Sequence, residues 1–102
     1  MGDSELAILA RFEAKPDEAE TVAQFLRDAR EAAEAEEGMT TWYAVRFDET
    51  RFGIFDTFPD EAGRQAHLEG EIATELLERA DELFVEEPDI DANVDVIAAT
   101  GD

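Results

Sequence analysis

One histidine, His67, is the most distinctive candidate for chemistry in this sequence of 102 residues. It is the only side chain whose unperturbed pKa lies near neutrality, so it could accept or release a proton at physiological pH. The alternative is a histidine at a helix end that caps the helix or packs against it. The chain has no cysteine, which excludes thiol nucleophiles, disulfides and thiolate metal sites. Its only serine is Ser4, so no Ser/His/Asp arrangement is supported.

Arg11 and Asp56 form the second candidate pair, because an arginine that is half-buried in a barrel needs a carboxylate partner. They fall on the first and third predicted strands, which we expect to be neighbours. We expect both side chains on the sheet face that points away from the helices. Arg11 could then bind or stabilise an oxyanion. The alternative is a purely structural salt bridge between Arg11 and Asp56.

Aromatic and apolar side chains provide candidate walls for a pocket. Trp42 and Tyr43 are adjacent on a predicted strand and therefore face opposite ways. One of them should line a pocket or a dimer seam, and the other should pack under the helices. Phe52, Ile54 and Phe58 make one strand face apolar, which would suit a planar aromatic ligand. The alternatives are core packing for Trp42 and a dimer interface for the other three.

The elements that position these residues follow from the spacing of apolar residues and from the turn residues between them. Alternation predicts strands, helical spacing predicts helices, and Asp60 is suited to cap a short helix. The predicted elements are a strand at 5–13, a helix from Pro16 to Gly38, strands at 39–47 and 51–58 joined by a hairpin loop at 48–50, a short helix at 61–68, a longer helix between Gly70 and Pro88, and a strand at 90–99.

With right-handed crossovers, this order predicts one α+β domain over residues 1–102, with a core at about 5–99. The fold is the ferredoxin-like split βαβ type, with four antiparallel strands and the helices on one face. The second face of the sheet is only half polar, and we expect it to carry Leu9, Ile54 and Phe58. No element remains to cover that face. A second copy of the chain could do so, and the sequence therefore predicts a homodimer that closes a barrel.

The charge of the chain is extreme, with 28 acidic residues against eight basic ones and a formal net charge of −20. Such a surface repels phosphate backbones and anionic membranes, which excludes nucleic-acid and membrane partners. Lys15 is the only lysine, and an acid excess with few lysines is typical of adaptation to high salt; an ordinary acidic protein is the alternative. No apolar run approaches the ~20 residues of a membrane helix, and no signal peptide is recognisable, so we expect a cytoplasmic protein. The acidic helix faces match no ordered oxygen-ligand loop, and no metal is expected.

Four short segments give the sequence a family resemblance. They are Leu-Ala-Arg-Phe at 9–12 before Lys-Pro, Glu-Gly-Met at 37–39, Arg-Phe leading to Phe-Asp-Thr-Phe within 51–58, and Ala-His-Leu at 66–68. In their order and spacing they resemble the antibiotic biosynthesis monooxygenase family of small dimeric α+β-barrel proteins. The resemblance covers about residues 6–98.

This resemblance implies a pocket between sheet and helices and a cofactor-independent oxygenase that acts on a small phenolic or quinol substrate. His67 would then take the substrate's proton, Arg11 would stabilise the anion, and Phe52, Ile54, Phe58 and Trp42 would form the walls. A dimeric barrel that binds a small apolar molecule without turnover is the alternative. The chain departs from the family pattern, since position 56 holds Asp where Glu is common and position 58 holds Phe where Trp is common. The haem-degrading branch is disfavoured, because Arg11 stands in place of its asparagine and the last long helix has no histidine.

Overall fold

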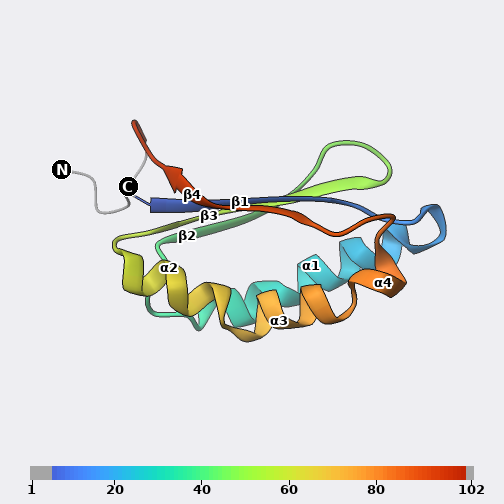
Figure 1. Cartoon of the computed structure of the whole chain (residues 1–102), viewed down its shortest axis with the longest axis horizontal. Coiled ribbons are helices and arrows are strands. Elements are labelled where there is room, and N and C mark those ends of the chain that lie inside the picture. The colour runs from blue at the N-terminus through green and yellow to red at the C-terminus, as the bar shows by residue number, and fades with distance from the viewer. Residues whose placement is uncertain (1–5, 101–102) are drawn as a thin grey trace.

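The computed structural model describes residues 6–100, so Ser4 and the predicted strand start at residue 5 lie outside the described residues. The elements are β1 (Leu6–Glu13), the 3-10 turn η1 (Pro16–Glu18), α1 (Ala19–Glu34), β2 (Thr41–Arg46), β3 (Arg51–Phe58), α2 (Glu61–Leu68), α3 (Glu71–Glu78), α4 (Ala80–Leu83) and β4 (Asp89–Asp95). Four antiparallel strands in the order β2-β3-β1-β4 make one sheet. All four α-helices lie on the same side of this sheet, as Figure 1 shows. The predicted α+β ferredoxin-like fold is confirmed.

The core lies between the sheet and the helices. The rings of Phe12 and Phe52 on β1 and β3 stack with centroids 6.5 Å apart, and Phe84, just after α4, lies 5.0 Å from Phe12. Phe25 and Leu26 of α1 close this cluster from the helix layer. Each fully buried side chain of this size stabilises the fold by about 1.5–3 kcal/mol.

The register of the ladder decides which residues share a face. Ile8 pairs with Asp56 and Ala10 with Ile54, whereas Arg11 pairs with Gly53. Since paired residues of an antiparallel ladder point to the same side, Asp56 shares its face with Ile8 and Ala10. Those residues are buried under the helices, and Arg11 is on the other face and exposed.

The third strand was therefore predicted with the right boundaries but the wrong side. Phe52, Ile54, Asp56 and Phe58 do share one face, and they are at most 5 % exposed, but that face is turned toward the helices. The expectation that Ile54, Asp56 and Phe58 lie on the open face is wrong. The physical reason is that the alternate residues of β3 that form its more apolar face are stabilised when the helices cover them and exclude water.

The open face carries a smaller apolar surface. Leu9 and Phe55 are paired and half-buried, while Tyr43 and Val45 of the edge strand β2 are 57 % and 42 % exposed. Trp42, whose face the sequence left undecided, is turned toward the helices, with Asp56 as its partner in the register. In residues 6–100, no helix is both long and apolar enough to cross a bilayer.

Smaller boundary differences have local causes. The first long helix ends at Glu34, four residues before Gly38, because residues 35–38 form a turn that leads into β2. The single helix predicted between Gly70 and Pro88 is divided at Arg79 into α3 and α4. The last strand is shorter than predicted and ends at Asp95.

Candidate functional site

His67 lies near the end of α2 and is buried, with 5 % of its surface exposed. Its Nδ1 is 2.8 Å from Oε1 of Glu36, and its Nε2 is 3.0 Å from Oδ2 of Asp56. Both ring nitrogens therefore face a carboxylate. With an ionised carboxylate at each nitrogen, both nitrogens donate, and the ring is then an imidazolium held between two anions.

The electrostatics of this cluster favour the charged ring. Burial lowers the pKa of His67, but the hydrogen bonds to Asp56 and Glu36 and the charges of both carboxylates outweigh burial and raise the pKa above the ordinary value of 6.5. Asp56 is 1 % exposed, so its charge is removed from water and depends on this partner. We call Asp56, His67 and Glu36 the proton chain.

A close approach of two glycines brings the members of the proton chain together. Gly63, four residues and about one turn before His67, lies against Gly38, and a Cβ atom at Gly63 would clash with the backbone oxygen of Gly38. Only glycine permits this contact. It holds α2 beside the turn that follows α1, where Glu36 is found.

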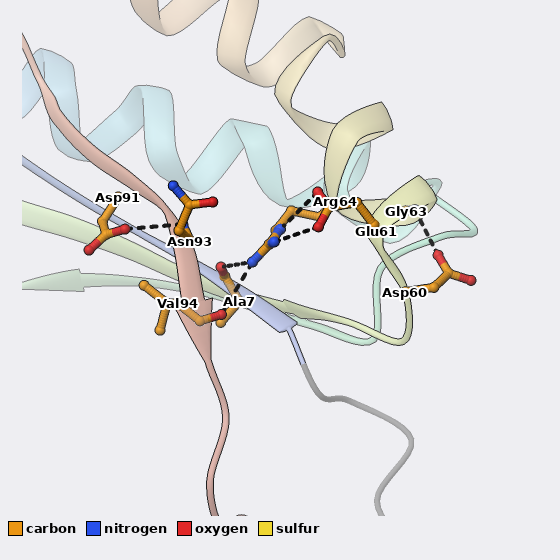
Figure 2. Close-up of polar contacts among 8 residues, drawn as sticks. All are labelled: Ala7, Asp60, Glu61, Gly63, Arg64, Asp91, Asn93 and Val94. Carbon is orange, nitrogen blue, oxygen red and sulfur yellow. Dashed lines mark hydrogen bonds and ion pairs between the residues drawn. The ribbon is translucent and has the colours of Figure 1, made fainter.

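Two further contacts fix the orientation of α2. Asp60 caps the helix, with its Oδ1 accepting a hydrogen bond of 2.8 Å from the Gly63 amide, as predicted. Arg64 is 6 % exposed and donates to the backbone oxygens of Ala7 and Val94 at 3.2 Å each. Its guanidinium also pairs with Glu61 at 2.6 Å. Figure 2 shows Arg64 reaching from α2 to the β1–β4 pair, so α2 is tied to the sheet and His67 has little freedom to move.

Two buried polar atoms next to the proton chain lack a hydrogen-bond partner among residues 6–100. They are Nε1 of Trp42 and Oδ1 of Asp56. The two residues are register partners on β2 and β3, so their Cβ atoms are about 4.5–5.5 Å apart. A buried donor and a buried acceptor without partners are rare in a native protein, and here both belong to neighbouring residues of the sheet.

A cleft opens beside this cluster, between the end of α1 and the edge strand β2. Its volume is about 390 Å³, and its lining includes Glu36, Trp42, Met39 and Ala33. Glu36 is thus the member of the proton chain that reaches a cleft, and 24 % of its side chain is exposed. A proton that enters from the cleft could pass through Glu36 to His67.

The structure brings together most of the residues that the sequence singled out. His67 contacts Asp56, its ring lies 5.5 Å from that of Phe58, and Trp42 is the neighbour of Asp56 on the next strand. Phe52 and Ile54 lie farther along the same face, in the core.

Arg11 is the exception. The expected Arg11–Asp56 ion pair is wrong, since the two side chains lie on opposite faces of the sheet and the Asp56 carboxylate bonds to His67. The buried arginine of this region is Arg64, which the sequence analysis missed.

Glu36 is the other functional candidate that sequence reasoning missed. It is one of several acidic residues near the end of a surface helix, and no spacing rule distinguishes it from Glu34 or Glu37. Only the contact between Gly38 and Gly63 could have pointed to it. Over residues 6–100, no group of three or more His, Asp or Glu side chains is arranged to hold a metal ion.

Comparisons with known proteins place the chain in a family. No protein-family model matches the sequence, and no curated protein matches it. The solved structure of NE2512, a protein of unknown function from Nitrosomonas europaea, is 44 % identical, with a TM-score of 0.93, over 98 % of this chain and 96 % of the other.

More distant structures share the fold. PA3566 from Pseudomonas aeruginosa is 23 % identical with a TM-score of 0.77, over 93 % of this chain and 96 % of the other. An antibiotic biosynthesis monooxygenase is 20 % identical with a TM-score of 0.75, over 93 % of this chain and 99 % of its own. The chain therefore belongs to the same family as NE2512 of Nitrosomonas europaea and has the fold of the antibiotic biosynthesis monooxygenases.

Proposed function

We propose that this protein is a cofactor-independent monooxygenase of the antibiotic biosynthesis monooxygenase type, acting on a small phenolic or quinol substrate. The observation that carries the proposal is the buried proton chain, which starts at Asp56, passes through His67 and ends at Glu36 in a cleft lined by Trp42. The fold shared with an antibiotic biosynthesis monooxygenase supports the reaction class.

The chemistry begins with removal of the phenolic proton. A phenolate is electron-rich enough to react with oxygen, whereas the phenol is not. Glu36 faces the cleft, so it receives the proton and passes it to neutral His67, whose other nitrogen remains bonded to Asp56. Neutral His67 is the competent form, and turnover therefore rises as pH increases through the raised pKa of His67.

The overall reaction balances without an added reductant. A phenol with a free ring position and one O₂ give a quinone and one water molecule. One oxygen atom enters the ring and the other leaves as water, and the phenol supplies all four electrons. The indole of Trp42 lines the same cleft as Glu36 and provides an aromatic wall for the substrate ring. Arg11 has no part in this scheme because it lies on the other face of the sheet.

A binding protein without turnover is the second candidate, and one observation favours it. Each ring nitrogen of His67 already faces a carboxylate. A buried ion-pair cluster that only stabilises the fold would have the same contacts. The two candidates differ in whether the proton chain exchanges protons with a ligand during oxygen consumption.

We also propose that the working form is a homodimer. The open sheet face carries Leu9, Tyr43, Val45 and Phe55, and the helices leave it uncovered. Burying ~500 Å² of apolar surface per subunit would contribute on the order of 10 kcal/mol before association costs. A second sheet packed on this face would close a barrel.

Oxygen uptake by the full chain tests the function. A panel of phenols and quinols is supplied in aerated buffer without cofactor, and uptake is compared for wild type, His67→Ala and Glu36→Gln. Glu31→Gln, at an exposed position of α1 outside the cleft, is the matched control. We expect a loss of about 10²–10⁴-fold in the first two variants and none in the control. No uptake with any compound, or full uptake by both His67→Ala and Glu36→Gln, would contradict the proposal.

A further inference from the structure

A second cleft lies between α1 and β2, beside the one that Glu36 reaches. Its volume is about 460 Å³, and its apolar walls include Leu26, Trp42 and Phe52. Its charged lining consists of arginines alone, namely Arg27, Arg30 and Arg46. In four other clefts of this protein, at least two carboxylates line the wall. A cleft with three of the seven arginines and no lining carboxylate is unexpected in a chain of net charge −20.

The three arginines are not all neutralised by their neighbours. Arg46 pairs with Glu20 at 3.0 Å and its guanidinium lies 4.9 Å from the centroid of Phe52, which fixes it against the wall. Arg30 pairs with Glu34 at 3.4 Å, and both side chains are largely exposed, so that pair is weak. Within residues 6–100, Arg27 makes no ion pair. At least one positive charge in the cleft therefore lacks a counter-ion.

The two clefts share walls. Arg30, Trp42 and Ala44 line both of them, so the two clefts adjoin along α1 and β2, and we call the pair the groove. Glu36 lines only the first cleft, Arg27 and Arg46 line only the second, and Arg30 and Trp42 lie where the two clefts meet. A ligand that fits this arrangement has an acidic hydroxyl at one end, an aromatic ring in the middle and an anion at the other end.

We propose that this groove binds phenols that carry a carboxylate, with the carboxylate on Arg27 and Arg30 and the ring against Trp42. This inference rests on the proposed function for the place of the hydroxyl, but the binding of the anion does not depend on turnover. Guanidinium–carboxylate hydrogen bonds are charge-assisted and strong. Repulsion by the net charge acts over longer distances and is screened at ~0.1 M salt, where the Debye length is ~10 Å.

Binding of a matched ligand pair tests the inference. The probes are 4-hydroxybenzoate and its neutral analogue 4-hydroxybenzamide, titrated into the full chain by calorimetry. Because Trp42 is the only tryptophan, its fluorescence reports whether the ligand enters the groove. We expect the acid to bind at least about tenfold more tightly than the amide and to change the fluorescence of Trp42.

The variants are Arg27→Gln with Arg30→Gln, and Arg11→Gln on the opposite face as the matched control. The double variant should lose the preference for the acid, and the control should keep it. These arginines are exposed, so the fold should persist, and circular dichroism verifies this; Arg27→Gln alone serves if the double variant is unfolded. Equal binding of acid and amide, no binding of either, or an unchanged preference in the double variant would overturn the inference.

Oxygen uptake separates this inference from the proposed function. If the acid binds in the groove but wild type oxidises no compound of the panel, the function fails and the inference stands. If neutral phenols and phenolic acids are oxidised with the same KM, the inference fails and the function stands.

Discussion

Replacing Asp56 with asparagine should destabilise the protein strongly, although the two side chains have the same shape. Asp56 is 1 % exposed, and its Oδ2 accepts a charge-assisted hydrogen bond of 3.0 Å from Nε2 of His67. Losing that bond costs about 1.5–3 kcal/mol. At a pH below 6.5, where His67 is an imidazolium, the new NH₂ group of Asp56→Asn either faces the N–H of His67 or replaces Oδ1, which has no partner in residues 6–100. A buried donor without a partner costs about 1–3 kcal/mol more.

The sum is about 2.5–6 kcal/mol, which brackets the ~3–5 kcal/mol range for removing one partner of a buried ion pair. For a domain of this size, the loss corresponds to a fall in Tm of more than ~10 °C. Urea unfolding in molar KCl, followed by circular dichroism, measures the free energy of unfolding with charge repulsion screened. Asp89→Asn at an exposed position is the matched control and should change that free energy by less than ~0.5 kcal/mol.

A double-mutant cycle with His67→Gln isolates the interaction itself. If Asp56 and His67 stabilise each other, the double variant should be less destabilised than the sum of the single variants, by about 1–3 kcal/mol. Strict additivity, or a cost of less than ~1 kcal/mol for Asp56→Asn, would refute the reasoning that the proton chain is a buried, coupled ion-pair cluster.

Three other properties follow from the same structure. Because the pKa of His67 is raised in the folded state, protonation of His67 stabilises the fold fully below pH 6.5, and this contribution is lost as pH rises through the folded-state pKa. The free energy of unfolding of wild type should therefore fall over that window relative to His67→Gln. Parallel curves of unfolding free energy against pH for the two proteins would contradict this. With a net charge of −20, thermal midpoints should rise between ~0.1 M and ~1 M KCl as the Debye length falls from ~10 to ~3 Å, and a flat or falling midpoint would argue against adaptation to salt. Light scattering in molar salt should give twice the chain mass of 11.3 kDa, and Tyr43→Glu on the open face should halve it; a wild-type monomer would remove the dimer proposal.

Periodicity and turn residues were sufficient to predict the fold. The alternation at 51–58 matches β3 residue for residue, and the prediction of α2 after an Asp60 cap is confirmed. These signals are local, since each depends on residues close together in the chain. Strand order then followed from the handedness of the crossovers, and β1 does lie beside β3.

The site depended on information that local patterns do not contain. Alternation correctly predicted that Ile54, Asp56 and Phe58 share one face of the sheet. It did not show that this is the face that the helices cover. An aspartate on a strand usually marks a solvated side, and here it is buried because His67 comes from a helix eleven residues later and compensates its charge. The sequence does not say that the turn holding Glu36 meets α2, because this contact depends on the two glycines far apart in the chain.

Titration of His67 measures the charge state of the proton chain itself. As the only histidine, it can be titrated by NMR without ambiguity in the assignment. We expect a midpoint above 6.5 in the wild-type protein, and a lower midpoint in both Asp56→Asn and Glu36→Gln. Glu31→Gln, at an exposed position of α1 outside the cleft, should leave the midpoint unchanged. A wild-type midpoint at or below 6.5, or one that neither variant moves, would contradict the claim that Asp56 and Glu36 hold His67 as an imidazolium.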